Sequence, residues 1–255
     1  MSANGSPCTL ITIPISHYCE KARWALDRCG IDYREEGHLP LLHYLPARRA
    51  GGGRTVPVLV AGDEVVADST DIVRWADRQA PAGLIPDDPG GRAEVDQLED
   101  YFDKVLGPHA RRWAYHQVLG DRALSLEMGK LGVPAWERRT LTVIRPLAAR
   151  VLRRGLNISA ETAERSRTRV DECFDRAADL MADGRRCLAG DRFTAADLTF
   201  AALSAPVLFP DGHPVPMPAL ERFSDEVQAA VAGWRAHPAG RFALRLYADE
   251  RHPRG

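Results

Sequence analysis

The first eighty residues alternate short apolar runs with segments of helical periodicity. Residues 10–15 form an apolar run that predicts a buried strand. Apolar positions then recur at helical spacing over residues 20–29, and Gly30 supplies the stop signal for that helix. A strand that leads into a loop is predicted over residues 31–36, whereas two prolines leave the structure of residues 38–49 ambiguous.

A hairpin and a helix complete this first part of the pattern. Residues 58–60 and 64–67 predict two strands, and Gly62 with Asp63 forms the turn between them. A helix is predicted over residues 70–79, with acidic side chains in its first turn. The predicted order of elements is therefore strand, helix, strand, helix, strand, strand, helix.

Every periodic segment after residue 91 is helical. A stretch rich in proline, glycine and aspartate, residues 81–91, predicts the linker that precedes this helical part. Helices are expected at residues 93–106, 110–119, 161–181, 197–205 and 219–237. Gly107-Pro108 is expected to kink or break the first helix, and residues 120–159 predict one or two irregular helices.

The start of the helix at residues 197–205 carries a local folding signal. Thr194 and Asp197 have the spacing of a capping box, with aspartate in place of the usual glutamate or glutamine. Phe193 and Leu198 stand where a hydrophobic staple would pack. The helix is almost wholly apolar, so we expect it to be buried and its capping residues to serve folding.

Size and charge limit the classes of function. At 255 residues and 28.1 kDa, the chain can bury a sizeable core. A net charge of -1 provides no bulk field toward nucleic acid or anionic lipid, so neither is an expected partner. No apolar stretch approaches the ~20 residues that span a bilayer. Residues 1–7 lack the basic and apolar regions of a signal peptide.

The cysteines are five in number, scattered, and without a C-x-x-C motif. This usage argues against a disulfide framework and against a zinc site, so we expect no metal. Free thiols are typical of a reducing compartment, and the expected location is the cytoplasm.

Ser16 is the first candidate for chemistry, because it lies where the first predicted strand meets the first predicted helix. The first turn of a helix offers unpaired backbone N–H groups and the positive end of the helix dipole. An anion such as a thiolate is stabilised there. Serine is also a common N-cap residue, so the position alone leaves a purely structural role open.

Three short motifs follow one another in this part of the chain: Ser16-x-x-Cys19, Val56-Pro57 and Asp68-Ser69. Together with the helical part and its capping box, they resemble the cytosolic glutathione S-transferase superfamily over roughly residues 9–247. The resemblance implies an α/β thioredoxin-like N-terminal domain, residues 8–82, and an all-α C-terminal domain, residues 92–250. It also implies a homodimer.

The resemblance assigns the thiol chemistry to Ser16. This residue falls where the family places its catalytic serine or cysteine, so its hydroxyl would donate a hydrogen bond to the glutathione sulfur and favour the thiolate. Cys19 would take the second, resolving position of the ancestral C-x-x-C, which makes it an alternative nucleophile, although a structural role is favoured at this position. With serine at the first position, a disulfide cycle through both is not available. Tyr18 is a lesser candidate for the hydroxyl donor.

Four further residues match the positions at which the family binds glutathione. The backbone N–H and C=O of Val56 would pair with the cysteinyl part, as an added strand does, beside a cis Pro57. Asp68 would pair with the γ-glutamyl ammonium. The hydroxyl and backbone N–H of Ser69 would bind the γ-glutamyl carboxylate. In the alternative reading Pro57 only shapes a turn, and Asp68-Ser69 only caps a helix.

Position alone gives the candidate partners of the glycyl carboxylate of glutathione and of the second substrate. Arg54 is a candidate for the carboxylate through its proximity to the Val56-Pro57 motif, and His43 is a looser one. A hydrophobic electrophilic small molecule would bind between the domains, facing the Ser16 turn. Candidate lining residues are Tyr101, His109, Arg112, Trp113, Tyr115 and His116.

The leading hypothesis is a glutathione S-transferase-like enzyme with a role in detoxification, in which the glutathione thiolate attacks an electrophilic carbon. Glutathione is then a co-substrate. A glutathione-dependent isomerase or peroxidase on the same site is one alternative, and a non-catalytic binding or structural member of the superfamily is another. The use of a different low-molecular-weight thiol also stays open.

Overall fold

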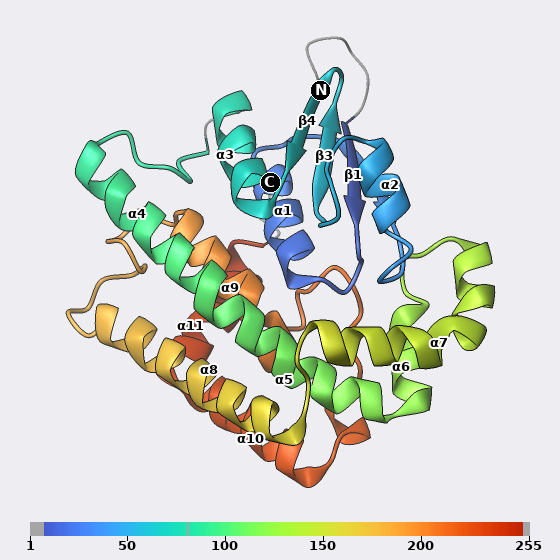
Figure 1. The fold of residues 1–255 in the computed structure, drawn as a ribbon. Helices are drawn as coiled ribbons and strands as arrows, with labels where there is room; N and C mark the ends of the chain where they lie inside the picture. The colour runs from blue at the N-terminus through green and yellow to red at the C-terminus, as the bar shows by residue number, and fades with distance from the viewer. Residues whose placement is uncertain (1–7, 81, 252–255) are drawn as a thin grey trace.

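The computed structural model describes residues 8–80 and 82–251. Figure 1 shows a small sheet with its helices in one part of the molecule and a larger group of helices in the other. The strands are β1 (Cys8–Thr12), β2 (Tyr33–Gly37), β3 (Val58–Ala61) and β4 (Glu64–Ala67). They lie in the order β2-β1-β3-β4, with only β1 and β2 parallel. The expected α/β architecture of the N-terminal part is confirmed.

Three helices cover the two faces of this sheet: α1 (His17–Arg28), α2 (Tyr44–Arg49) and α3 (Ser69–Gln79). The strand register aligns Leu10 with Leu59 on one face, where both pack into the large core shared with α1 and α3. The other face carries Ile11 and Val58, which pack with Ala47 of α2. Because side chains alternate along a strand, both faces of the sheet are covered.

The first strand and helix have different bounds from those predicted. β1 ends at Thr12, and α1 begins at His17, three residues earlier than the sequence pattern indicated. Pro14 has no N–H to continue the ladder. The chain instead forms a turn in which the Ser16 N–H donates to the Ile13 carbonyl at 2.9 Å. This turn places Ser16 at the N-cap of α1.

The helical part confirms the expected all-α architecture. Its helices are α4 (Pro89–Tyr101), α5 (Gly107–Gly120), α6 (Arg122–Gly129), α7 (Ala135–Gly155), α8 (Ala160–Leu180), α9 (Ala195–Leu208), α10 (Asp225–Ala236) and α11 (Pro238–Asp249). A π-helical turn, η1 (Phe102–Leu106), joins α4 to α5, and a 3-10 turn, η2 (Leu220–Arg222), precedes α10. The segments between residues 120 and 159 are thus two helices, α6 and α7.

α9 is the central helix of this part, and Pro206 is its only residue that is not buried. The Asp197 carboxylate accepts hydrogen bonds from the backbone N–H and the hydroxyl of Thr194, at 2.8 and 2.9 Å, and from the Leu188 N–H at 2.7 Å. These contacts fix the start of α9 as the capping-box pattern predicted. Burial of the helix follows from its almost complete lack of polar side chains.

The helix does not break at Gly107-Pro108, because α4, η1 and α5 follow one another without a gap, but the α-helix is interrupted there by the π turn η1. In the π turn the Gly107 N–H donates to the carbonyl of Phe102, five residues earlier. Pro108 has no N–H to offer to Asp103, which precedes it by the same spacing. The helix accommodates the missing hydrogen bond by this local change in helical pitch, and the chain continues as a helix without a break.

The predicted helix at residues 219–237 is shorter in the structure. α10 begins only at Asp225, where the Ser224 side chain accepts from the Val227 N–H. Serine at this position favours a helix start over a helix interior. The following helix, α11, spans Pro238–Asp249.

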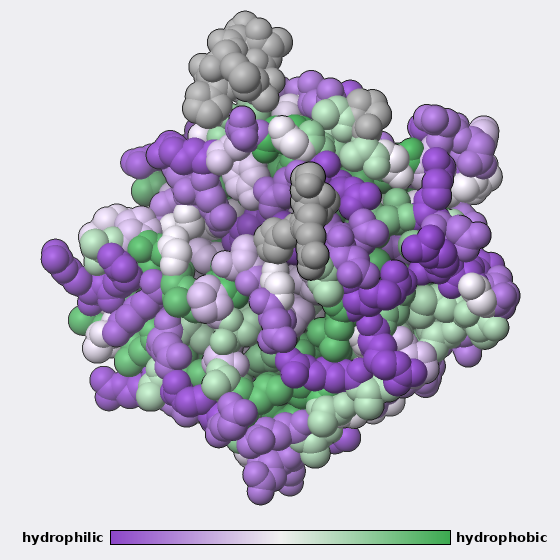
Figure 2. All heavy atoms as spheres, turned by 180° about the vertical axis from the view of Figure 1, so that it is seen from behind, coloured by the Kyte–Doolittle hydropathy of each residue, from purple (hydrophilic) through white to green (hydrophobic). Residues whose placement is uncertain are grey.

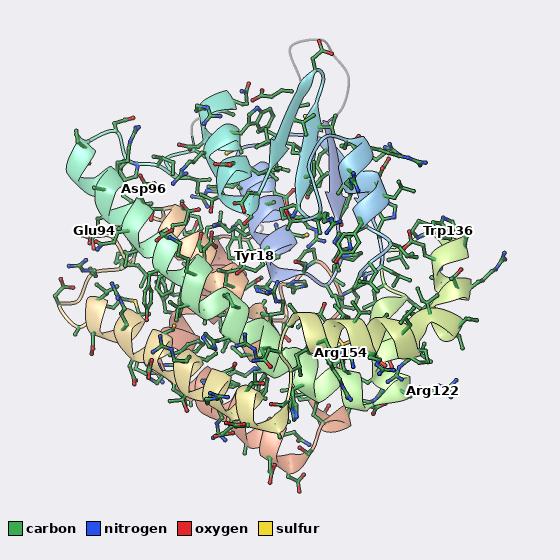
Figure 3. All side chains as sticks on the ribbon, viewed as in Figure 1. Tyr18, Glu94, Asp96, Arg122, Trp136 and Arg154 are labelled. Atoms are coloured by element: carbon green, nitrogen blue, oxygen red, sulfur yellow. The ribbon has the colours of Figure 1, made fainter. Side chains whose placement is uncertain are left out.

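The outer surface mixes polar and apolar side chains. Figure 2 shows the back of the molecule, where hydrophilic side chains alternate with apolar patches. Trp136 of α7 lies at the periphery in Figure 3. Within residues 8–80 and 82–251, no helix combines the length and the apolar character needed to cross a bilayer. The same residues contain no cluster of three or more side chains suited to hold a metal ion.

Candidate functional site

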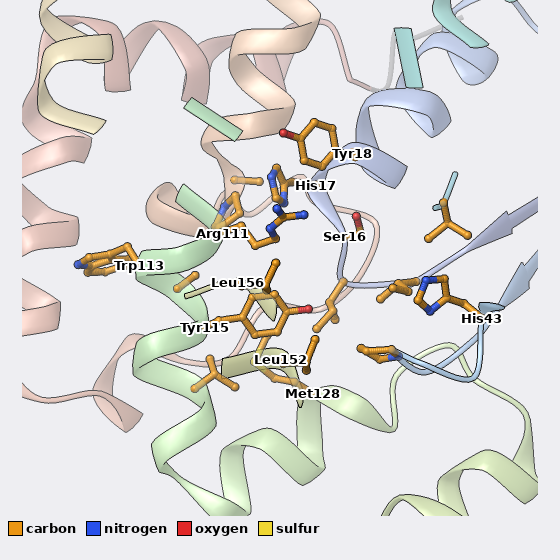
Figure 4. A pocket seen from close by; sticks show the side chains of 18 of the residues that line it. Ser16, His17, Tyr18, His43, Arg111, Trp113, Tyr115, Met128, Leu152 and Leu156 are labelled. Atoms are coloured by element: carbon orange, nitrogen blue, oxygen red, sulfur yellow. The ribbon is translucent and has the colours of Figure 1, made fainter. Parts of the chain in front are cut away.

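Ser16 lines a cavity of about 330 Å³ between the N-terminal part and the helices α5, α6 and α7. Figure 4 shows Ser16 at the rim of this cavity, facing α5. Its backbone occupies the N-cap position of α1, but its side chain accepts no capping hydrogen bond. The capping hydrogen bond that a purely structural role of the Ser16 hydroxyl would require is therefore not formed.

A second cavity of about 520 Å³ lies beside the first one, between α3 and the segment from α4 to η1. Both cavities are lined by Tyr18, Thr55, Val56 and Arg111. The predicted site residues divide between them: Ser16 and Arg54 line the first cavity, Pro57, Asp68 and Ser69 line the second, and Val56 lines both. The structure thus brings all six together along one continuous cleft.

The Val56-Pro57 peptide bond is cis. Val56 precedes β3, outside the ladder that pairs Val58 with Ile11 and Ala67. Among the described residues, no partner pairs with the backbone N–H or C=O of Val56. This stretch of main chain is therefore free to pair with an extended peptide in the cleft.

Asp68 and Ser69 stand at the start of α3, where the helix presents backbone N–H groups. One oxygen of Asp68 accepts from the Thr70 N–H at 2.9 Å, and its φ of 93° lies in the region that non-glycine residues rarely adopt. The hydroxyl and N–H of Ser69 have no partner among the described residues. Asp68 thus caps the helix with one oxygen and also lines the second cavity.

Tyr18 is not available as a thiol-activating hydroxyl. Its O–H donates to the carbonyl of Asp103 at 2.8 Å, the carbonyl that Pro108 leaves without a helical partner. Figure 3 shows Tyr18 at the centre of the molecule, where α1 meets the helical part. Burial raises the pKa of Tyr18, so the group stays protonated and serves as this donor.

Two other candidates from the sequence are buried. Cys19 is fully buried, and this burial raises the pKa of its thiol to about 11, which leaves almost no thiolate at pH 7. The structural reading of Cys19 is therefore favoured. The His43 ring accepts from the Leu41 N–H at 3.1 Å and holds the loop before α2. It is buried, whereas Arg54 is exposed at the rim of the first cavity.

Of the six candidates for the pocket between the domains, Trp113 and Tyr115 are the two that line the first cavity. Arg112 instead donates to the Leu156 carbonyl at 3.0 Å, and His109 contacts Ser166 of α8 at 3.0 Å. Tyr101 and His116 line neither cavity. Sequence reasoning missed Arg111 and His17, which both line the first cavity.

Comparison with known families gives two matches in chain order. Residues 10–84 match the glutathione S-transferase N-terminal domain, and residues 139–230 match the glutathione S-transferase C-terminal domain. Together they cover about two thirds of the chain. The chain belongs to the glutathione S-transferase superfamily. A comparison with curated proteins finds no match.

Solved glutathione S-transferase structures share this fold. A glutathione S-transferase from Sinorhizobium meliloti 1021 is 19% identical at a TM-score of 0.60, with 96% of this chain and 99% of that chain covered. The theta class enzyme from Xanthomonas axonopodis pv. citri, solved with glutathione bound, is 21% identical at a TM-score of 0.52. The match covers 96% of this chain and 98% of that chain. Glutathione S-transferase-I, bound with lactoylglutathione, is 16% identical at a TM-score of 0.59, and the match covers 94% of this chain and 100% of that chain.

His17 fixes the Ser16 turn of this glutathione S-transferase family member onto the helical part. Its ring Nε2 donates to the Gly107 carbonyl at 3.1 Å, since a carbonyl can only accept. Burial, together with the nearby Arg111 charge, lowers the pKa of His17 to about 3. The imidazole is therefore neutral at physiological pH, and it adds no charge to the cleft.

A buried ion cluster joins the same two parts of the protein below the second cavity. The Lys21 ammonium of α1 is fully buried and donates to the Thr70 hydroxyl at 2.7 Å and to the Asp103 carboxylate at 2.9 Å. It also forms an ion pair with Glu99 at 2.8 Å. Burial raises the pKa of Glu99, and the Lys21 charge opposes this effect.

Gly107 of this transferase-family protein permits the close approach of Tyr18, because a Cβ at residue 107 would lie 2.2 Å from the Tyr18 hydroxyl oxygen. We expect Gly107→Ala to displace Tyr18, to break its bond to Asp103, and to lower the free energy of unfolding by about 1–3 kcal/mol. The midpoint of thermal unfolding should fall by about 2–4 °C per kcal/mol.

Gly120→Ala is the matched control at the end of the same helix. A Cβ there meets no atom within 4 Å, so alanine should be neutral or stabilise by up to about 1 kcal/mol. Equal thermal stability of the Gly107→Ala variant and the wild-type protein would contradict the steric argument.

Proposed function

We propose that this protein conjugates glutathione to electrophilic small molecules. The observation that carries the proposal is the Ser16 hydroxyl, which stands at a helix N-terminus, makes no capping bond, and faces a largely apolar cavity beside a polar one. A hydroxyl in this position donates to a thiolate more strongly than to a thiol. Together with the helix dipole, this donation lowers the thiol pKa, which is about 8.5 in water.

Glutathione fits the cleft in one direction. Its cysteinyl backbone pairs with the unpartnered N–H and C=O of Val56, next to the cis Pro57. Its γ-glutamyl end enters the polar cavity, where Asp68 accepts from the ammonium and Ser69 donates to the carboxylate. The glycyl carboxylate leaves toward the exposed Arg54. This placement directs the sulfur at Ser16.

The chemistry then follows from thiol activation and positioning. The thiol proton passes to solvent when glutathione binds, and the Ser16 O–H stays protonated as a hydrogen-bond donor. The sulfur lone pair forms a bond to the electrophilic carbon held in the apolar cavity, and the displaced electron pair leaves with the leaving group or moves into the electrophile. Holding both reactants in one cleft supplies the orientation that a bimolecular reaction in water lacks.

The arrangement of the whole protein belongs to this proposal. We assign residues 8–82 to the glutathione-binding domain and residues 92–250 to the helical domain that carries most of the second-substrate pocket. Family membership supports a homodimer that acts in the cytoplasm in detoxification. Sedimentation of the purified protein tests the dimer directly.

Calorimetric titration of the wild-type protein with glutathione tests the proposed function. We expect saturable binding at one site per chain, with ultraviolet thiolate absorbance of the bound thiol appearing well below pH 8. Turnover of an activated chloronitroarene should accompany binding. Absence of glutathione binding would reject the proposal and favour a non-catalytic role or a different thiol.

Asp68→Asn is expected to weaken glutathione binding by about tenfold. The substitution removes the charge that pairs with the γ-glutamyl ammonium, but it keeps an oxygen for the Thr70 N–H. Asparagine also tolerates positive φ. The loss corresponds to about 1.4 kcal/mol, which is typical of one partly exposed charge-assisted bond.

The control for this prediction is a glutathione analogue without the γ-glutamyl ammonium, glutaryl-cysteinyl-glycine. Wild type and Asp68→Asn should bind this analogue equally well, as measured by the same calorimetry. A tenfold loss for the analogue too would show that Asp68 acts through the fold of α3 and not through the ammonium.

A further inference from the structure

Arg111 is a cation at the junction of the two cavities, and the carboxylates of the cleft, Asp68 and Asp103 among them, line only the second cavity. Its guanidinium makes no ion pair or hydrogen bond with a described residue, and its Cζ lies over the ring of Tyr18, 5.9 Å from the ring centroid. Figure 4 shows the side chain extending from α5 beside His17 into the space in front of Ser16. An unpaired guanidinium in a cleft is suited to an anionic ligand.

The apolar cavity offers no negative charge to balance Arg111. Its described lining contains no aspartate or glutamate, and its cationic side chains are Arg54 and Arg111. The three histidines in the lining are His17, His43 and His213, and burial lowers the pKa of each. They are therefore uncharged near pH 7, which leaves a positive pocket with apolar walls.

The shape of the pocket adds a preference for flat apolar groups. Rings from four different segments line it, with aliphatic and thioether side chains between them. They include the rings of Tyr44, Tyr115, Phe209 and Phe223. A volume of about 330 Å³ accepts one small aromatic molecule beside the glutathione sulfur.

We propose that the second substrate is a flat apolar electrophile that carries a carboxylate or a similar anionic group, and that Arg111 binds this group. The inference rests on the proposed function, since it concerns the partner of the activated thiol. A thiolate and a carboxylate in one cleft repel each other, and a guanidinium between them offsets this repulsion. Arg111 thus selects an anionic substrate where Ser16 alone would disfavour it.

The test uses a matched pair of chloronitroarenes, 4-chloro-3-nitrobenzoate and its methyl ester. In both, the glutathione sulfur bonds to the ring carbon that carries chlorine, and chloride leaves with the electron pair of the C–Cl bond. Each kcat/KM is divided by the rate constant of the same compound with free glutathione at the same pH. This ratio removes the difference in intrinsic reactivity between the two rings.

We expect Arg111→Met to lower the normalised kcat/KM for the benzoate by about tenfold or more, and to change that for the ester by less than about threefold. Arg111→Lys should recover part of the loss, because lysine keeps the charge but not the fork of the guanidinium. Arg122→Met, on the exposed surface of α6 (Figure 3), is the control for loss of an arginine elsewhere.

Binding without glutathione supplies a second readout that does not depend on turnover. Nitroarenes quench tryptophan fluorescence, and Trp113 belongs to α5, the helix that forms one side of the pocket. Arg111→Met should weaken quenching by the benzoate and leave quenching by the ester unchanged.

Two results separate this inference from the proposed function. If wild type binds glutathione and converts the ester but Arg111→Met affects both compounds equally, the inference is wrong. An equal loss with a raised pKa of the bound thiol would assign Arg111 to the thiolate instead. If wild type binds no glutathione, the proposed function itself fails, and the inference fails with it.

Discussion

Replacement of Ser16 by alanine should raise the pKa of enzyme-bound glutathione by about one to two units and lower kcat/KM up to about 100-fold below that pKa. A hydrogen bond to a charged group contributes about 1.5–3 kcal/mol, and one pKa unit equals about 1.4 kcal/mol. The substitution leaves the fold of α1 intact, because the Ser16 side chain makes no capping bond. Ultraviolet absorbance of the bound thiolate against pH gives the pKa directly.

The loss in rate of this variant should change with pH in one direction. Thiolate is the reactive form, so the loss in rate should be largest at pH 6 and should shrink as the pH rises above the new pKa. Glutathione affinity should change little, since its other contacts remain. Ser16→Thr keeps a hydroxyl donor and serves as the matched control. An unchanged thiol pKa in Ser16→Ala would remove Ser16 from the mechanism.

Lys21→Met is expected to lower the free energy of unfolding at pH 7 by about 3–5 kcal/mol. Methionine fills the same space but leaves the carboxylates of Glu99 and Asp103 without the ammonium that they share. Removal of one partner from a buried ion pair leaves a desolvated charge, which costs more than the pair contributed. Urea denaturation of both proteins measures the difference.

The destabilisation should become smaller at pH 5. Burial raises the pKa of Glu99 above its unfolded value, and loss of Lys21 raises it further. Protonation of Glu99 in the folded state therefore stabilises the variant as the pH falls, and this contribution is lost again as the pH rises through the folded pKa.

Lys104→Met is the control for the loss of a lysine on a neighbouring element. Lys104 pairs with Asp100 at 2.6 Å, but its side chain is 72% exposed, so we expect a change of less than about 1 kcal/mol. Equal effects of the two substitutions would show that the burial of Lys21 does not decide its contribution.

Local signals in the sequence identified the framework of the site. The hairpin from Val58 to Ala67 and the box of Thr194 and Asp197 are short-range features, set by turn and capping chemistry within a few residues. The same holds for the start of α3 at Asp68. The sequence also located the cis proline as a candidate, although only the fold determines which isomer is present.

Long-range contacts decided what the sequence could not. Nothing near Lys21 in sequence predicts its complete burial, because its partners lie 49 to 82 residues away. The sequence around Tyr18 does not show that its hydroxyl is engaged, because the carbonyl that accepts its hydrogen bond belongs to Asp103, 85 residues later. Such roles depend on groups that meet only when α1 packs on the α4–η1 segment.

The sequence by itself determined the family resemblance, the order of elements and the position of Ser16, since these rest on local patterning. Only the tertiary structure decided which side chains of α5 face the cleft. The π turn at Phe102–Leu106 inserts an extra residue per turn and rotates every later position, so Arg111 faces the cleft and Arg112 faces α8. The sequence marked Gly107-Pro108 as an irregularity, but only the fold shows that it takes the form of a π turn, because a change of helical pitch has no periodic signature.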